Sequence, residues 1–189
     1  MTDTGKVTAV YVGAEDVLEK NVRDAIDLDL EGIVGDRHRG LARECWEADK
    51  QPEGTLRRNE RQWSAVSVEE LNEITELMSL SEPLDAGTIG ANLCIDGFAL
   101  SRLPRGSLLR FESGAVLMVE EYNPPCSDMG AKIAEEYVGQ DSTPIAVGAF
   151  SEAAKFLRGV VGVVEVPGTI RVGDSVTVEL ERLPKWLRR

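Results

Sequence analysis

The chain has 189 residues, which is enough to bury a hydrophobic core of its own. Its 21 basic and 33 acidic side chains leave a net charge of −12, which disfavours nucleic acid and anionic membrane surfaces as partners. The N-terminus lacks a signal-peptide pattern and no stretch approaches the roughly 18 apolar residues of a membrane span, so we expect a cytoplasmic protein. Three cysteines, one histidine and no CxxC pair predict free thiols and disfavour a structural zinc site.

The first third of the chain alternates short extended runs with turns. Apolar and polar residues alternate over 7–12, which predicts a first strand, and 28–34 is a second extended run. Segment 35–40 has glycines at both ends around four charged or titratable side chains, which suits either a solvated turn or one that presents polar groups to a site. Residues 41–60 are charged and aperiodic and predict a long loop, an insertion that we expect to be the most mobile internal segment.

The rest of the chain is richer in extended runs than in helices. Residues 62–66 predict a strand, and Ser67 with Glu70 forms a capping box that opens a helix. Glycine and proline turns separate the later extended runs, which are 93–95, 108–111, 115–122, 160–166, 169–172 and 175–180. Helical patterns follow Cys126 and cover 150–157. In the tail, Trp186 and Leu187 are expected to pack back onto the rest of the chain.

Many short strands at regular spacing, with few helices, predict a mainly β (α+β) fold. We expect a closed or nearly closed β-barrel with a few peripheral helices. Strict alternation of strands and helices is absent, and so are the GxGxxG and GxxxxGKS motifs. A doubly wound nucleotide-binding sheet is therefore disfavoured.

The segment around Cys126 is the strongest candidate for chemistry. Pro124 and Pro125 end a strand directly before it, and a helix begins after it, capped by Ser127 or Asp128. The helix carries one apolar stripe, which consists of Met129, Ile133 and Tyr137. A helix N-terminus favours a thiolate, the form of cysteine that attacks electrophiles and binds metals. The alternative is that Cys126 is a small buried residue after a Pro-Pro turn. Cys94 lies among apolar neighbours, and we interpret it as a core residue.

An ordered set of short motifs resembles the MOSC domain family, small stand-alone bacterial type, which is named after the C-terminal domain of molybdenum cofactor sulfurase. The motifs are Gly35-Asp36-Arg37-His38, the strand and helix around 66–71, Gly90-Ala91-Asn92, Arg105-Gly106, Pro125-Cys126, and Arg158-Gly159-Val160 through Gly173-Asp174. The resemblance runs over about 7–180 and implies one MOSC-like β-barrel domain spanning 1–189. This chain departs from the family at Ala91, where the usual motif Gly-Glu-Asn has an acidic residue.

The resemblance also implies the residues of a site. In relatives the cysteine that aligns with Cys126 ligates molybdenum or is proposed to carry sulfur as a persulfide, and a soft thiolate suits both tasks. Asp36, Arg37 and His38 would line the site, with arginine holding the phosphate of the pterin cofactor. Asn92 and Arg158 are the remaining cofactor-binding candidates. Asp36 has the alternative role of orienting its neighbours.

Two main functions follow from the resemblance. The first is reduction of N-hydroxylated compounds through the molybdenum cofactor (molybdopterin), with a separate reductase as electron donor because the chain has no iron–sulfur cysteine set and no flavin motif. The second is a non-enzymatic carrier of persulfide sulfur or of the molybdenum cofactor itself, supplied by a sulfur donor protein. A cysteine hydrolase that uses Cys126 and His38 is a third reading, permitted by composition alone.

Overall fold

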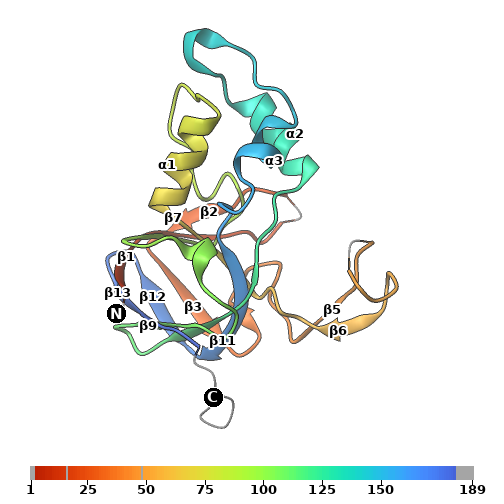
Figure 1. Cartoon of the computed structure of the whole chain (residues 1–189). Coiled ribbons are helices and arrows are strands. Elements are labelled where there is room, and N and C mark those ends of the chain that lie inside the picture. Colours follow the sequence, from red (N-terminus) through yellow and green to blue (C-terminus); the bar gives the residue numbers. More distant parts are fainter. Residues whose placement is uncertain (1–2, 16, 48, 182–189) are drawn as a thin grey trace, which may run out of the picture.

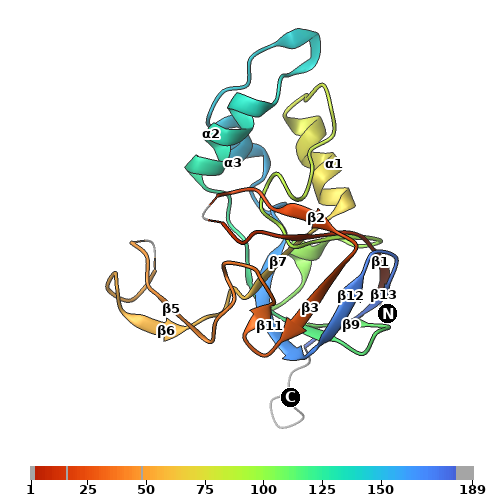
Figure 2. The same ribbon diagram turned by 180° about the vertical axis from the view of Figure 1, so that it is seen from behind.

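The computed structural model describes residues 3–15, 17–47 and 49–181. Seven strands close into a β-barrel, with three helices stacked at one end of it (Figures 1 and 2). In order around the barrel the strands are β13 (Ser175–Glu179), β9 (Leu108–Phe111), β10 (Val116–Tyr122), β11 (Val160–Val166), β7 (Trp63–Ser67), β8 (Leu93–Asp96) and β1 (Thr4–Val12). β1 pairs with β13 and closes the ring. The mainly β barrel predicted from the sequence is confirmed.

All neighbouring barrel strands are antiparallel except β7 and β8, which run parallel. The crossover that a parallel pair requires is supplied by helix α1 (Val68–Leu77). Smaller sheets flank the barrel: β2 (Asn21–Arg23) pairs with β1, and β12 (Gly168–Arg171), β3 (Ala25–Asp29) and β4 (Gly32–Ile33) form a three-stranded sheet. Residues 28–34, predicted as one extended run, contain the turn between β3 and β4.

The apolar residues form two cores. One fills the barrel, where alternation along the strands directs residues such as Leu109 and Phe111 inward and Arg110 outward. The other lies between the barrel and the helices and includes Met129, Ile133 and Tyr137, the stripe predicted for helix α2 (Ser127–Glu136). Cys94 also lies in this second core, as the sequence indicated.

The structure shows where helices α1 and α3 begin and end relative to the prediction. The predicted capping box of α1 is present, with Ser67 and Glu70 bonded reciprocally. The helix predicted over 150–157 is shorter, α3 (Ala149–Ala153), because Phe156 takes a positive φ of 64° and turns the chain back toward the barrel. Each helix in the described ranges is too short or too polar to cross a bilayer.

Residues 41–60, predicted as a long loop, contain two short strands, so the secondary structure predicted there was wrong. Strands β5 (Ala42–Glu44) and β6 (Leu56–Arg58) pair as a hairpin that projects from the barrel (Figure 1). Its stability comes from ion pairs rather than from apolar periodicity: Asp49 accepts from Arg43 at 2.6 Å and from Arg57 at 2.7 Å. The pattern of hydrophobic residues therefore could not reveal these strands. The expected packing of Trp186 and Leu187 falls outside the described residues.

Candidate functional site

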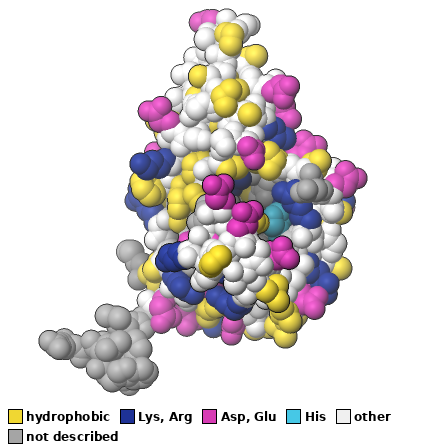
Figure 3. All heavy atoms as spheres, turned by 90° about the vertical axis from the view of Figure 1, so that its right-hand side faces the viewer, with side chains coloured by type: hydrophobic (Ala, Val, Ile, Leu, Met, Phe, Trp, Pro, Cys, Tyr) yellow, Lys and Arg dark blue, Asp and Glu magenta, His cyan; other side chains and the backbone are white. Residues whose placement is uncertain are grey.

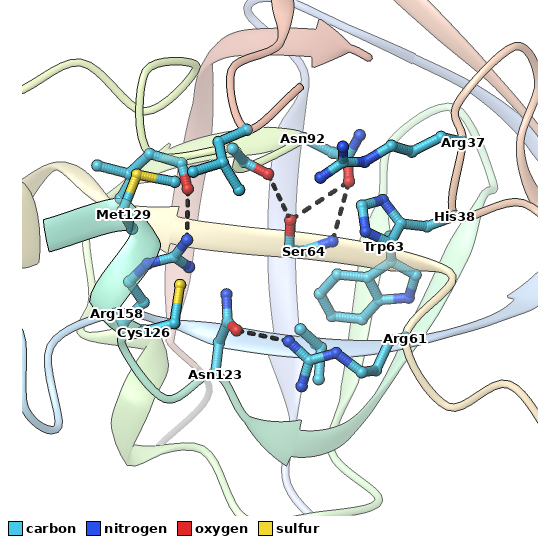
Figure 4. A pocket seen from close by; sticks show the side chains of 14 residues that line it. Arg37, His38, Arg61, Trp63, Ser64, Asn92, Asn123, Cys126, Met129 and Arg158 are labelled. Carbon is cyan, nitrogen blue, oxygen red and sulfur yellow. Dashed lines mark hydrogen bonds between the residues drawn. The ribbon is translucent and has the colours of Figure 1, made fainter. Parts of the chain in front are cut away.

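A pocket of about 90 Å³ opens at the helical end of the barrel, where β10 leads into α2 (Figure 4). Arginine, histidine, amide and thiol groups provide its polar lining, and no carboxylate contributes to it. The side chains come from segments far apart in the sequence and include Arg37, His38, Arg61, Trp63, Ser64, Asn92, Asn123, Cys126, Met129 and Arg158. Although the chain is acidic overall, the charged side chains that line this pocket are basic.

Cys126 occupies the N-cap of α2, with an extended backbone at φ −118° and ψ 162°. The prediction of Ser127 or Asp128 as the N-cap was therefore wrong, because Cys126 itself occupies that position. Its carbonyl accepts from the Gly130 amide at 3.1 Å, while its side chain makes no capping hydrogen bond. The Cys126 thiol is exposed, whereas Cys45 and Cys94 are buried. The pocket thus contains the most accessible thiol of the chain.

Gly130 fixes the position of this helix start. A Cβ at residue 130 would lie 2.4 Å from the carbonyl oxygen of Val147, so a larger residue would push α2 away from the segment before α3. The chain on that side also reaches Cys126 directly, because Ser151 donates its hydroxyl to the Cys126 carbonyl at 3.3 Å. Helices α2 and α3 therefore hold the thiol in place together.

Asp36 lies beneath the pocket and does not line it, in contrast to the prediction. Its Oδ1 accepts from the backbone amide and Nδ1 of His38, both at 3.0 Å, and its Oδ2 accepts from Lys20 Nζ at 2.9 Å, Asn92 Nδ2 at 2.8 Å and the Gly13 amide at 3.1 Å. Burial opposes the charge of this carboxylate, but the hydrogen bonds from His38 and the charge of Lys20 outweigh it and hold the pKa of Asp36 well below its usual range. Asp36 therefore acts as an anchor for its neighbours.

Lys20 completes this network and was missed by the sequence analysis. Its ammonium group is buried and also donates to Asn92 Oδ1 at 2.8 Å. Burial lowers the pKa of Lys20 to about 8, with the charge of Asp36 acting in the opposite direction. Lys20 lies in an aperiodic polar segment, so no sequence signal separates it from a surface lysine.

Asn92 links this buried network to the pocket. Besides its bonds to Asp36 and Lys20, it donates to the Tyr11 carbonyl at 3.1 Å and accepts from the Ser64 amide at 3.1 Å. Its amide is therefore largely committed to structure, although it lines the cavity. The neighbouring Ala91, where the family pattern has an acid, is buried in the helix-side core and does not line the pocket.

His38 and Arg37 reach the pocket from the turn above Asp36. The Nδ1 of His38 is held by Asp36, which leaves Nε2 as the atom that faces the cavity. Burial lowers the pKa of His38 despite the hydrogen bond that its ring donates to Asp36, so the neutral ring is favoured near pH 7. Figure 3 shows the histidine at the surface beside basic side chains. Arg37, His38, Asn92, Arg158 and Cys126, all predicted from the sequence, thus surround one cavity.

Arg158 is the most unusual side chain of the site. It is 92% buried, and its Nη2 donates to the Ile89 carbonyl at 2.5 Å. Its Nε and Nη1 are also shielded from solvent, yet have no hydrogen-bond partner among the described residues. Burial lowers the pKa of Arg158 to about 10, although the neighbouring Cys126 opposes the shift. Two strong donors are thus held in the protein without acceptors.

Arg61 and Asn123 form the opposite wall and were not predicted. Arg61 Nη2 donates to Asn123 Oδ1 at 2.8 Å (Figure 4). Burial lowers the pKa of Arg61, with the charge of Glu121 opposing the shift. Arg61 follows the charged, aperiodic segment 41–60 directly, and Asn123 precedes two prolines, so neither gave a sequence signal for a site.

An outer chamber of about 170 Å³ adjoins the first and shares Arg37, His38 and Arg61 with it. The β5–β6 hairpin supplies its far wall through Trp46, which is half exposed. The guanidinium of Arg43 lies 4.4 Å from the centre of the Trp46 ring, within cation–π range. The hairpin is therefore part of the site rather than a peripheral loop.

The donor atoms of the pocket determine what kind of cofactor it could hold. The described part of the chain has no cluster of three or more histidine, cysteine and acidic residues that could hold a metal ion alone. A metal would therefore need most of its ligands from a bound organic molecule, with one sulfur from Cys126. Such a molecule, if anionic, would meet the unpartnered nitrogens of Arg158. The residues present fit a cofactor that brings its own metal ligands.

Comparisons with known proteins identify the family and the fold. The MOSC domain model matches residues 40–177. A curated relative from Bacillus subtilis (strain 168), described as "Putative metal-sulfur cluster biosynthesis proteins YuaD", is 36% identical over 177 residues, which cover 93% of this chain and 90% of that protein. The crystal structure of B. subtilis YuaD superposes with a TM-score of 0.89 at 33% identity, over 96% of this chain and 99% of that one. YiiM from Geobacillus stearothermophilus shares the fold, with a TM-score of 0.63 at 14% identity over 93% and 75%. The chain belongs to the MOSC domain family.

Proposed function

We propose that the Cys126 pocket binds the molybdenum cofactor and that the protein uses it to reduce N-hydroxylated compounds. The observation that carries the proposal is an exposed thiol at a helix N-terminus beside a buried arginine with two unused donors. A thiolate suits a soft metal centre, and a guanidinium suits an anionic group on the same ligand. Electrons would come from a separate reductase, because the sequence has no motif for a second redox centre.

Each residue has a distinct role in this proposal. Cys126 would supply the protein's sulfur ligand to the metal. Arg158, Arg61 and Arg37 would hold the anionic part of the cofactor, while Asn92 keeps the floor of the pocket in place. The inner chamber is smaller than the several hundred Å³ of a typical ligand site, so the rest of the molecule would extend into the outer chamber. When bound, the group would supply two-electron redox chemistry.

A sulfur carrier is the second candidate. It is favoured by the name of the B. subtilis relative, which refers to metal–sulfur cluster biosynthesis, and by the single exposed thiol of this chain. Persulfide formation on Cys126 needs only that thiol and a sulfur donor. The cysteine-hydrolase alternative gains no support, because in the described part of the chain His38 makes no hydrogen bond to Cys126 and is instead held by Asp36.

Metal and sulfur analysis separates the two candidates. The wild-type protein, Cys126→Ser and the neighbouring control Ser127→Ala would be purified from a molybdenum-competent host. Stoichiometric molybdenum in wild type and control, lost in Cys126→Ser, supports the cofactor enzyme. Labile sulfur without molybdenum supports the carrier. Molybdenum that stays at full occupancy in Cys126→Ser contradicts the role given to the thiol.

A further inference from the structure

The wall of the inner chamber nearest Cys126 presents hydrogen-bond donors without acceptors. The Nε and Nη1 of Arg158 are buried and unpartnered. Asn123 offers its oxygen to Arg61, so its NH₂ group is left to point toward Cys126 and Arg158, with no partner among the described residues (Figure 4). The first turn of α2 has no side-chain cap, so its free amides face the same end of the helix as the thiol. The Arg158 nitrogens, the Asn123 NH₂ group and the first-turn amides of α2 are thus hydrogen-bond donors that a bound acceptor could satisfy.

Energetics indicate that this arrangement is a binding site. A buried guanidinium with two unpartnered nitrogens and no counter-ion is costly, and the described residues that line the cavity include no carboxylate to compensate its charge. Elsewhere in the molecule the same residue type is paired: Arg43 binds both Asp49 and Glu60, and Arg39 binds Asp29. Among the described residues, Arg158 has two buried nitrogens without a hydrogen-bond partner, whereas Arg43 has one, and Arg158 lines the same cavity as Cys126. An anion that enters the chamber would satisfy the two Arg158 nitrogens.

The size of the chamber limits the anion. About 90 Å³ accommodates a group of a few heavy atoms, such as a sulfonate, but not a ring system. Cys126 and Arg158 line the same chamber and interact electrostatically, so an anion held by the arginine would lie in the chamber that the thiol also lines. A ligand that joins an oxyanion to a sulfur electrophile would use both features.

We propose that the inner chamber is an oxyanion subsite and that thiosulfate is its ligand, delivering sulfur to Cys126. The inference rests on Cys126 as the working thiolate, which both candidate functions share. Arg158, the NH₂ group of Asn123 and the α2 amides hold the sulfonate, and the outer sulfur faces the thiolate. The thiolate attacks that sulfur, so a new S–S bond forms on Cys126 while the S–S bond of thiosulfate breaks. Sulfite leaves with the electron pair, and the charge of −3 is conserved without another reactant.

The experiment measures sulfur loading and anion selectivity on the full chain. Incubation with sodium thiosulfate should release sulfite and leave an equal amount of cyanide-labile sulfur on Cys126, with saturation. Arg158→Met should lower the second-order rate constant for loading by thiosulfate by about tenfold or more, because a charge-assisted contact is lost. Arg110→Met, which removes an exposed arginine paired with Glu179 at 2.7 Å, is the matched control and should change nothing.

Alkylation separates anion recognition from loss of thiol reactivity. Arg158→Met should slow labelling of Cys126 by anionic iodoacetate, relative to neutral iodoacetamide, and should remove protection by sulfate. If Arg158→Met does not fold, Asn123→Asp gives the same test, since it keeps an acceptor for Arg61 and places negative charge in the chamber. Thiosulfate loading that is unchanged in both variants, or both reagents slowed equally, would overturn the proposal.

The outcomes also separate this inference from the proposed function. A wild-type protein whose Cys126 reacts with iodoacetamide but releases no sulfite from thiosulfate overturns the inference and leaves the molybdenum proposal standing. Molybdenum retained in Cys126→Ser counts against the proposed function alone. A Cys126 that reacts with neither iodoacetamide nor thiosulfate contradicts both.

Discussion

Two buried charges lie on different sides of the pocket and differ in how many of their polar atoms are used. Asp36, beneath the pocket, accepts five hydrogen bonds across its two oxygens. Arg158, in the wall beside Cys126, uses one of three nitrogens. A saturated buried charge holds structure in place, because every partner it has depends on it. An unsaturated one costs stability until a ligand arrives. Burial alone therefore does not distinguish structural from binding residues, but hydrogen-bond saturation does.

The largest effect is expected from Lys20→Met. The substitution keeps most of the apolar stem but leaves the buried carboxylate of Asp36 without its cation, which should lower the free energy of unfolding by about 3–5 kcal/mol. Urea denaturation measures the change. Arg39→Met is the control, because Arg39 pairs with Asp29 and Glu31 at the surface and should lose no more than about 1 kcal/mol. Similar losses in the two variants would remove the distinction between the saturated network and ordinary ion pairs.

The decrease in the free energy of unfolding at acidic pH should depend on the ionisation of Asp36. Its pKa lies below the model-peptide value of 3.8 in the fold, so as pH falls the unfolded chain takes up this proton first and stability decreases. Asp36→Asn should be less stable than wild type by about 2 kcal/mol at neutral pH, where hydrogen bonds to a charged group are lost. The difference should narrow below about pH 4. A constant difference down to pH 2 would show that the charge of Asp36 is not what stabilises the fold.

The sequence predicted the barrel and the position of the site better than the roles within it. Alternation and glycine turns located most strands, and the capping box located α1, because these are local signals. The pairing of β5 with β6 depends on ion pairs across the hairpin, which periodicity does not register. The sequence left two roles open for Asp36, lining the site or orienting its neighbours, and the choice between them depends on Lys20, which is 16 positions away without any pattern between them. Hydrogen bonds and ion pairs between residues far apart in the sequence could not be predicted from local sequence patterns.

The cysteines extend the comparison to uncharged groups. Cys94 is buried and Cys126 is exposed, so Cys94→Ser should cost about 1–2 kcal/mol through a buried hydroxyl, whereas Cys126→Ser should stay within about 0.5 kcal/mol. Burial also raises the pKa of Cys94, which lowers its thiolate fraction. In alkylation at pH 7, followed by peptide mass analysis, Cys126 should be labelled well before Cys94. Equal labelling would contradict the packing described for Cys94.

Arg158→Met should change stability far less than Lys20→Met, although Arg158 is about as buried as Lys20. Methionine removes a charge that has no counter-ion and two donors that have no acceptors, and it loses one hydrogen bond to Ile89. These terms oppose each other, so urea denaturation without added anions should place the variant within about 1 kcal/mol of wild type, on either side. Added sulfate should stabilise wild type and not the variant, because only the arginine gains partners from it. A loss as large as that of Lys20→Met would mean that Arg158 holds the fold together, and hydrogen-bond saturation would then fail to separate structural charges from binding ones.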